Sequence, residues 1–386
     1  MELPSLKTIR QRYLLIAVIS LILFLMSTIT SYALFSYNKL VVSSTETTSV
    51  ETAYSAVPTP TPDPLAPYNV LLLGYGGGGH AGGEITDTMI VAQVIPREKR
   101  VILISIPRDM WVPLPLLKDG ETSYRKINNA YPLGNDPHQY LDRPEKYQGE
   151  LGGTTLAEDM VELVTGLPIR YFVVVNFNAF EQAVNNLGGI LVNVPVDFTD
   201  EYYPIEGLED ESCGKSEEDI EALTATISGY KLEQEFKCRY ETLEFSAGMQ
   251  PMDGATALKF VRSRHSQTYG NDFSRSQRQQ AVILALKNKM LSLGTLPKLV
   301  PLINTLTSHV RTDIGIGDIK EIWSTHGDLK DYTLETINLS TDNVLKESRS
   351  QDGQYILTPI GGTENWQAIH EYLETEIKQN KELDKT

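Results

Sequence analysis

The amino-acid sequence predicts an α/β fold, a layered αβα domain with a central mixed sheet, preceded by one transmembrane helix. Three observations support this fold class. Apolar strand patterns at 69–74 and 171–177 enclose an amphipathic helical pattern, an alternation typical of layered α/β domains. Two more strand patterns, 88–95 and 101–106, flank a short turn and predict a hairpin. An uncharged apolar segment near the N-terminus is the third observation.

The predicted helices are placed by their end signals. Thr155-Leu-Ala-Glu158 has the form of a capping box, and Gly166 is placed to end the helix that it opens. Asn178 is expected to cap the next helix, which ends before a strand at 190–194. A long helical pattern then runs from 274 to about 293. Its apolar side chains share one face, and they are Val282, Ile283, Leu286 and Met290.

The N-terminal segment has the properties of a membrane anchor. No charged residue lies between Tyr13 and Asn38, and about 20 apolar residues suffice to cross a bilayer. Three basic residues precede the segment, so the positive-inside rule keeps the N-terminus cytoplasmic and predicts export of the remainder. A cleaved signal peptide is the alternative, but the apolar run is longer than the usual signal core of about 7–15 residues.

The chain is expected to divide into five regions. They are a basic cytoplasmic segment (1–12), a transmembrane anchor (13–37), a Ser/Thr/Pro-rich linker (38–67), a main domain (68–310) and a C-terminal part (311–386). The linker composition predicts a semi-extended spacer. Within the main domain, the acidic stretch 199–244 breaks the alternation of strands and helices, which predicts an inserted surface excursion. The C-terminal part either completes the main domain or forms a small appendage.

The charge balance and the cysteines narrow the class of protein. The chain has 50 acidic and 34 basic residues, and this disfavours nucleic-acid binding because phosphate backbones need a basic face. Its two cysteines, Cys213 and Cys238, lie in the part predicted to be exported, where a structural disulfide is the first expectation. Without companion histidines, the two cysteines make a poor metal site.

Five arginines cluster in three short segments despite the acidic balance. They are Arg108, Arg262, Arg264, Arg275 and Arg278. The planar guanidinium group matches phosphate oxygens two at a time, so this clustering favours an anion-binding site. Arg262 and Arg264 would share a face if their segment is extended, whereas Arg275 and Arg278 lie one turn apart at a predicted helix start. The alternative is a set of surface salt bridges, which are abundant in acidic proteins.

Several of these segments, taken in order, resemble the motifs of the LytR–CpsA–Psr family of cell envelope-related transcriptional attenuator domain proteins. Each motif is several residues long, and the similar region covers about 69–295. The motifs are Leu-Leu-Leu-Gly74, Thr86-Asp-Thr-Met89, Ser105-Ile-Pro-Arg108-Asp109, Lys126-Ile-Asn-Asn-Ala-Tyr131, Asn176-Phe-Asn-Ala-Phe180, Arg262-Ser-Arg264 and Asp272-Phe-Ser-Arg275-Ser-Gln-Arg278-Gln-Gln280. Despite the historical name of the family, nothing in the chain resembles a DNA-binding module.

The resemblance implies that 68–310 is the catalytic domain of an extracytoplasmic phosphotransferase of the bacterial envelope. Members of the family take a glycopolymer from a polyprenyl-pyrophosphate carrier in the membrane and join it to peptidoglycan or another wall acceptor, typically with magnesium. The implied partners are therefore the lipid-linked glycopolymer, the wall acceptor and membrane lipid, with no nucleic acid. The alternatives are a polyprenyl-pyrophosphate hydrolase, which needs the same anion site, and a non-catalytic lipid- or wall-binding module.

The resemblance and the residue chemistry together suggest roles for individual residues. Those expected to be catalytic are Asp87, Arg108, Asp272 and Arg275. Those expected to bind substrate are Arg262, Arg264, Arg278, Arg125 and Lys126. Arginines can neutralise the charge of a pyrophosphate, and Asp272 is placed either as the general base or as a simple helix N-cap.

Asp87 is the expected ligand of Mg²⁺ shared with the substrate phosphates, and its alternative role is to cap a turn. Family members commonly carry a second acidic ligand shortly after the Leu-Leu-Leu-Gly motif, where this chain has Tyr75 or Gly76. The sequence therefore predicts that magnesium is held weakly.

Overall fold

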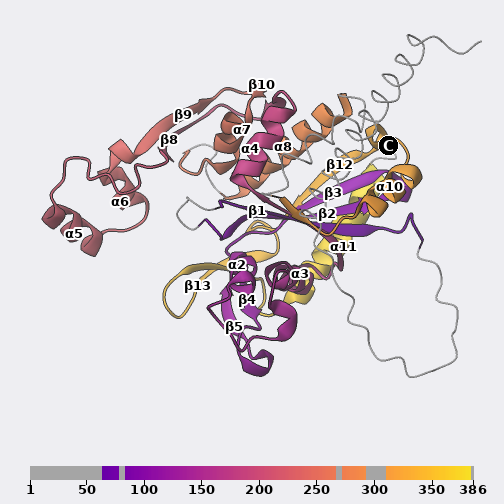
Figure 1. The fold of residues 1–386 in the computed structure, drawn as a ribbon, viewed down its shortest axis with the longest axis horizontal. Helices are drawn as coiled ribbons and strands as arrows, with labels where there is room; N and C mark the ends of the chain where they lie inside the picture. Colours follow the sequence, from indigo (N-terminus) through magenta and orange to yellow (C-terminus); the bar gives the residue numbers. More distant parts are fainter. Residues whose placement is uncertain (1–62, 78–82, 267–271, 293–309, 384–386) are drawn as a thin grey trace, which may run out of the picture.

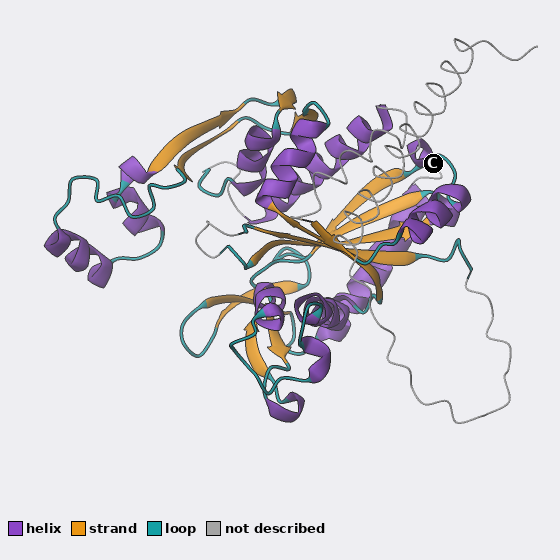
Figure 2. Cartoon of the chain, viewed as in Figure 1, coloured by secondary structure: helices purple, strands orange, loops and turns teal. Residues whose placement is uncertain are grey.

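The computed structural model describes residues 63–77, 83–266, 272–292 and 310–383, and its centre is a six-stranded mixed sheet (Figures 1 and 2). The strand order is β11 (Val310–Thr312), β6 (Ile169–Asn176), β1 (Tyr68–Tyr75), β2 (Thr86–Ile95), β3 (Arg100–Ser105) and β12 (Thr333–Asn338). The β1–β6 and β3–β12 pairs are parallel, and the other three pairs are antiparallel. The predicted central mixed sheet and the β2–β3 hairpin are confirmed.

The predicted anchor at 13–37 and almost all of the linker lie outside the described residues. Among the helices that the structure does describe, none combines the length and the apolar composition needed to cross a bilayer.

Helices cover both faces of the sheet, as expected of a layered αβα domain. On one face lie α3 (Gly152–Thr165) and α11 (Trp366–Leu383), and on the other lies α8 (Asp272–Ser292). Successive residues of a strand point to opposite faces. Leu71 and Leu73 of β1 therefore pack into the larger core beneath α3 and α11, whereas Ile90 and Leu103 face Ile283 of α8.

The opposite side of α8 packs on a second, smaller core. This core is built from α4 (Phe177–Asn186), α7 (Gly254–Arg262) and a two-stranded pair, β7 (Ile190–Val194) with β10 (Gly248–Met252). Val282 and Ala285 of α8 are buried there against Phe260 of α7. The strand predicted at 190–194 is confirmed, although it pairs outside the central sheet.

Two predicted helix starts were wrong. The α3 helix begins at Gly152, ahead of the capping-box motif, because its first turn lies against a neighbouring helix, α2 (Ala130–Asn135). A Cβ atom on Gly134 of α2 would come within 2.5 Å of the Gly152 carbonyl oxygen, so only glycine permits this approach. For α4 the N-cap is Asn176, whose Oδ1 accepts from Ala179 N at 2.9 Å, and Asn178 lies inside the helix.

The C-terminal part of the chain contributes strands to the central sheet. It supplies β11 and β12, the two outer strands of the central sheet. Arg100 of β3 is buried and donates to both carboxylate oxygens of Glu335 on β12, each at 2.7 Å. A further hairpin, β13 (Leu345–Arg349) with β14 (Tyr355–Pro359), lies beside the hairpin of β4 (Trp111–Leu114) and β5 (Ser123–Lys126).

The acidic stretch extends away from the central sheet (Figure 1). A two-stranded ribbon, β8 (Phe198–Pro204) with β9 (Tyr240–Phe245), carries α5 (Glu217–Thr226) and α6 (Tyr230–Glu235) at its far end. A disulfide joins Cys213 to Cys238 with their Cα atoms 5.6 Å apart, as expected. Neither α5 nor α6 buries a side chain, so the disulfide adds a covalent constraint to a part of the excursion with little buried surface.

Candidate active site

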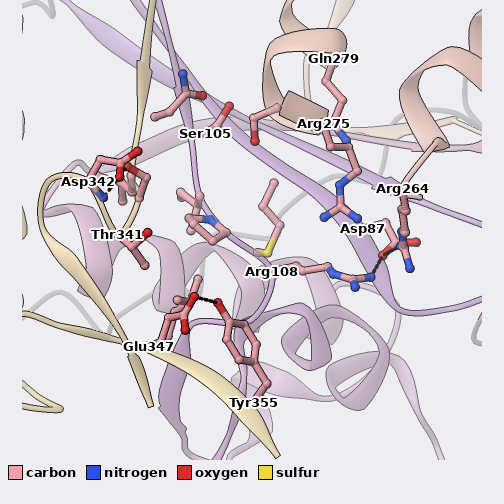
Figure 3. Close-up of a pocket in the computed structure, with 18 residues that line it drawn as sticks. Asp87, Ser105, Arg108, Arg264, Arg275, Gln279, Thr341, Asp342, Glu347 and Tyr355 are labelled. Carbon is pink, nitrogen blue, oxygen red and sulfur yellow. Dashed lines mark hydrogen bonds and ion pairs between the residues drawn. The ribbon is translucent and has the colours of Figure 1, made fainter. Parts of the chain in front are cut away.

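A cavity of about 640 Å³ opens at one edge of the central sheet (Figure 3). The parallel strands β3 and β12 both end there, at Ser105 and Asn338, and β2 begins beside them. Ile106 N donates to Met89 O at 2.9 Å, which continues the β2–β3 ladder as far as the loop that carries Arg108. The cavity thus lies at the carboxyl ends of strands, where α/β sheets commonly bind ligands.

Asp87 is the centre of an arginine cluster on one side of this cavity. Its Oδ1 atom lies 2.5 Å from Arg108 Nη1 and 3.0 Å from Arg264 Nη2. Arg275 lines the same side (Figure 3). Burial opposes ionisation of Asp87, but the charges of Arg264, Arg108 and Arg275 outweigh it and hold the pKa of the carboxyl below its usual 3.8. With three arginines around one carboxylate, this end of the cavity suits a multiply charged anion.

The start of α8 is fixed above the strand ends by two glutamines. Gln279 Nε2 donates to Thr88 Oγ1 at 2.8 Å, which ties the helix to β2. Gln280 Nε2 donates to Ser105 Oγ at 3.0 Å and to Asn338 Oδ1 at 2.8 Å, which ties it to β3 and β12. These bonds explain the paired glutamines of the motif, for which sequence reasoning assigned no role. Their effect is to hold Arg275 over the cavity.

Asp200 is a second residue whose role sequence reasoning missed. Its side chain is fully buried at the base of the excursion, and Oδ2 accepts from Ser263 Oγ at 2.7 Å, Arg264 N at 2.9 Å and His265 N at 3.2 Å. Burial raises the pKa of Asp200, but these hydrogen bonds outweigh burial and lower it overall. The carboxylate therefore fixes the backbone that carries Arg264. Many acidic residues lie in 199–244, so the sequence did not distinguish the buried Asp200 from the others.

Two of the predicted substrate-binding arginines lie away from the cavity. Arg278 is fully buried, donates to the Ser263 carbonyl oxygen and lies 5.2 Å from the centre of the Phe198 ring. Arg262 is the last residue of α7, so the expectation of an extended segment shared with Arg264 was wrong. Its guanidinium group lies 4.5 Å from the centre of the Phe177 ring and lines a separate cavity of about 270 Å³.

Arg125 and Lys126 also do not line the arginine cavity. Arg125, an exposed residue of β5, donates to Tyr124 O at 2.9 Å. Lys126 Nζ donates to Asp109 Oδ1 at 2.6 Å, and Asp109 in turn lies 3.5 Å from Arg108 Nε, so Lys126 supports the loop that carries Arg108. The backbone of Asp272 begins α8, but its side chain lies outside the described residues, and its choice between base and N-cap stays open.

The metal-binding chemistry of the cluster is limited to one carboxylate. Within the described ranges, no group of three or more His, Cys, Asp or Glu side chains is placed to hold a metal ion. Asp87 lines the cavity among the arginines, whereas Asp109, which also approaches Arg108, is buried and is not part of the cavity lining. Mg²⁺ is often bound through one or two carboxylates together with substrate phosphates and water, so a single aspartate fits a metal that arrives with its substrate.

The opposite side of the cavity comes from the C-terminal part of the chain, which sequence reasoning did not connect with the site. Its lining residues are Asn338, Ser340, Thr341, Asp342, Glu347 and Tyr355. Figure 3 shows the labelled side chains of this group facing the arginine cluster across the cavity. Hydroxyl, amide and carboxylate groups dominate here, and the basic side chains that line the cavity all lie on the other side.

The fold and this site define a member of one family. The chain belongs to the LytR_cpsA_psr family, whose sequence pattern matches residues 31–370. It is 28% identical over 284 residues to the polyisoprenyl-teichoic acid–peptidoglycan teichoic acid transferase TagU of Enterococcus faecalis, a match that covers 72% of this chain and 73% of that relative.

Two solved structures share the fold. The crystal structure of Bacillus subtilis TagV is 24% identical, with a TM-score of 0.52 over 81% of this chain and 98% of that one. The structure of the Streptococcus agalactiae protein gbs0355 is 18% identical, with a TM-score of 0.55 over 81% of this chain and 88% of that one.

Proposed function

We propose that this protein is an extracytoplasmic phosphotransferase that moves a glycopolymer from a polyprenyl-pyrophosphate carrier to a cell-wall acceptor such as peptidoglycan. The observation that carries the proposal is the cluster of Arg108, Arg264 and Arg275 around Asp87 in an open cavity. A relative that is 28% identical is named as a transferase of teichoic acid between a polyisoprenyl carrier and peptidoglycan, which supports the same reaction class.

Donor binding follows from the charges of the cluster. The two phosphates of the carrier bring negative charge, and guanidinium groups bind phosphate oxygens through short, charge-assisted hydrogen bonds. Arg108 and Arg264 already lie within hydrogen-bond distance of one carboxylate oxygen, so the donor phosphates compete with Asp87 for groups that are held in place. Preorganised donors of this kind stabilise charge that develops on the leaving phosphate.

The transfer step exchanges one phosphorus–oxygen bond for another. The acceptor hydroxyl oxygen attacks the phosphorus that bears the glycopolymer, and the bond from this phosphorus to the polyprenyl phosphate breaks. The leaving polyprenyl phosphate takes the bonding electron pair, and the arginines neutralise it. The hydroxyl proton passes to a general base, for which Asp272 remains the candidate from the sequence.

Asp87 is the residue that would hold Mg²⁺ together with the donor phosphates. The metal would add positive charge beside the leaving phosphate, and its affinity would be low because one carboxylate supplies the protein ligand.

We place the domain outside the cytoplasmic membrane, held by a single anchor at 13–37 with the N-terminus in the cytoplasm. The linker at 38–67 would keep the site close to the lipid carrier.

The proposal is tested with full-length protein in detergent, a polyprenyl-pyrophosphate-linked saccharide as the donor and peptidoglycan fragments as the acceptor. The expected product is a phosphodiester between saccharide and peptidoglycan, detected by mass spectrometry, together with polyprenyl phosphate. Release of free phosphosaccharide alone would assign a hydrolase. Donor binding without turnover would assign a non-catalytic binding module.

A further inference from the structure

The cavity has two chemically different sides that come from distant parts of the chain. The arginine side is built from β2, the loop after β3, the segment after α7, and α8. The C-terminal side is built from the end of β12 and from the β13–β14 hairpin. Asp342, Glu347 and Tyr355 of the C-terminal side face the arginines across the open space in Figure 3.

The two sides are held at a fixed separation by backbone hydrogen bonds. Leu357 N on β14 donates to Asp109 O at 2.9 Å, one residue beyond Arg108. Leu339 N, after β12, donates to Ser105 O at 3.2 Å. A ligand that reaches the β13–β14 hairpin is therefore positioned directly relative to the arginine cluster.

The chemistry of the C-terminal side disfavours the binding of a second phosphate there. No basic residue lines it, and within the described part of the chain neither Asp342 nor Glu347 forms an ion pair. Two exposed carboxylates repel an anion but accept hydrogen bonds well from hydroxyl and amide groups. This side therefore suits a neutral ligand rich in such groups.

Tyr355 adds a surface for a saccharide ring. Its hydroxyl donates to Glu347 Oε1 at 3.3 Å, and 40% of the residue is exposed. A tyrosine presents an apolar face beside a polar edge, the combination that matches a sugar ring with its apolar faces and equatorial hydroxyls. Ser340 and Thr341 supply further hydroxyl groups to the same wall.

We propose that the C-terminal side of the cavity, formed by Asp342, Glu347 and Tyr355, is the subsite for the neutral glycan acceptor. This inference rests on the proposed function. The arginine side holds the pyrophosphate, and the C-terminal side orients the acceptor so that one of its hydroxyl groups points across the cavity. Positioning of this kind converts an encounter between two substrates into a step within one complex.

The test compares Glu347→Gln and Asp342→Asn with the wild-type full-length protein in detergent. The donor is a polyprenyl-pyrophosphate-linked saccharide, and the acceptor is a soluble, uncharged oligosaccharide of N-acetylglucosamine, the neutral sugar of the peptidoglycan glycan. Loss of a hydrogen bond to a charged group weakens binding by about tenfold or more, so the acceptor KM should rise by that factor. Donor affinity and acceptor-independent donor hydrolysis should not fall, because both depend on the arginine side and each substitution removes a negative charge from the shared cavity.

A matched control is Glu374→Gln, which changes an exposed glutamate of α11 that pairs with Lys378 outside the cavity. It should leave every parameter unchanged. Tyr355→Phe should raise the acceptor KM less than Glu347→Gln, because it keeps the ring and removes only the hydroxyl. An unchanged acceptor KM in both carboxylate variants would overturn the inference. So would a loss of donor affinity in Glu347→Gln, which would assign this side to the saccharide of the donor.

Direct binding separates the failure of this inference from the failure of the proposed function. Calorimetry with the oligosaccharide alone should show binding to wild-type protein and at least about tenfold weaker binding to Glu347→Gln. If the wild-type protein shows this binding but transfers no phosphosaccharide, the subsite stands and the proposed reaction fails. If the wild-type protein transfers phosphosaccharide but Glu347→Gln binds the oligosaccharide as tightly as wild type, the proposed reaction stands and the proposed subsite is wrong.

Discussion

The arginines of this protein fall into two groups that look alike in the sequence and differ in their surroundings. Arg108, Arg264 and Arg275 line an open cavity around a carboxylate. Arg262 and Arg278 pack on aromatic rings, and Arg278 also donates to a backbone carbonyl oxygen. The comparison teaches that what a guanidinium group faces, and not how exposed it is, separates the two groups, because Arg275 and Arg278 are both buried. Arg275 lines the cavity that contains Asp87, whereas Arg278 is enclosed by the fold and Arg262 lines a different cavity.

The largest effect should come from Arg278→Ala, through stability. The substitution leaves a void in the second core and removes the donor to Ser263 O, so the free energy of unfolding should fall by about 3–5 kcal/mol. Chemical denaturation measures this loss. Arg278→Met keeps much of the side-chain volume and should recover part of the stability with wild-type donor affinity. If a folded Arg278→Met protein loses donor affinity, Arg278 contributes to donor binding and does not serve the fold alone.

Asp87→Asn should have the largest effect on catalysis. The amide keeps the shape of the side chain but removes the charge that orders two arginines and, in our proposal, the metal ligand. Removal of one preorganised electrostatic group lowers kcat by about 10²–10³-fold. Donor affinity should fall much less, because the arginines remain. Steady-state kinetics and a magnesium titration of donor binding provide the measurements. If kcat of this variant equals that of the wild type, Asp87 is not catalytic and only caps a turn.

Arg264→Ala and Arg262→Ala form the sharpest matched pair, since the two positions are two residues apart. Loss of a charge-assisted bond to phosphate costs about 1.5–3 kcal/mol, so Arg264→Ala should weaken donor binding more than about tenfold with little change in melting temperature. Arg262→Ala should leave donor affinity intact and lower stability slightly, through lost contact with Phe177. If both variants lose donor affinity equally, Arg262 contributes to donor binding as Arg264 does, and the division into two groups is wrong.

Asp200→Asn should produce a smaller, pH-dependent effect. The folded-state pKa of Asp200 lies below the ordinary 3.8, so the ionised carboxylate stabilises the fold. This contribution is complete above about pH 4 and is lost as pH falls through the lowered pKa. The stability difference between wild type and variant should therefore be constant from pH 7 to about pH 5 and shrink in stronger acid. Denaturation curves over this range test it, and a difference that grows below pH 4 would contradict the assignment.

Sequence reasoning captured what local pattern determines. The β2–β3 hairpin follows from two apolar strands around a short turn, and Gly166 ends α3 in the left-handed conformation that glycine favours. The start of α3 was missed, because it depends on the approach of a second helix at Gly134. Helix starts set by tertiary contact leave little local signal.

The candidate site was predicted in part for the same reason. Motif resemblance found Asp87, Arg108, Arg264 and Arg275, which the structure brings together at one cavity. Motif resemblance could not distinguish the role of Arg275 from that of Arg278. Arg275 lines the cavity, whereas Arg278 packs on the Phe198 ring, and this difference depends on the tertiary surroundings of α8. Glu347 lies far along the chain from the arginine motifs, and only the folded sheet brings it into the same cavity.

The two outer strands of the sheet have a consequence for the order in which the protein is made. The inner strands emerge first during synthesis, and their outer edges on β6 and β3 then present unpaired backbone groups. Such edges invite pairing with other chains. They are covered only when β11 and β12 arrive, more than 130 residues after β6. A nascent chain that stalls before position 310 would expose two unpaired edge strands, on β6 and β3. Synthesis of the last part of the polypeptide is therefore needed to protect the sheet from aggregation.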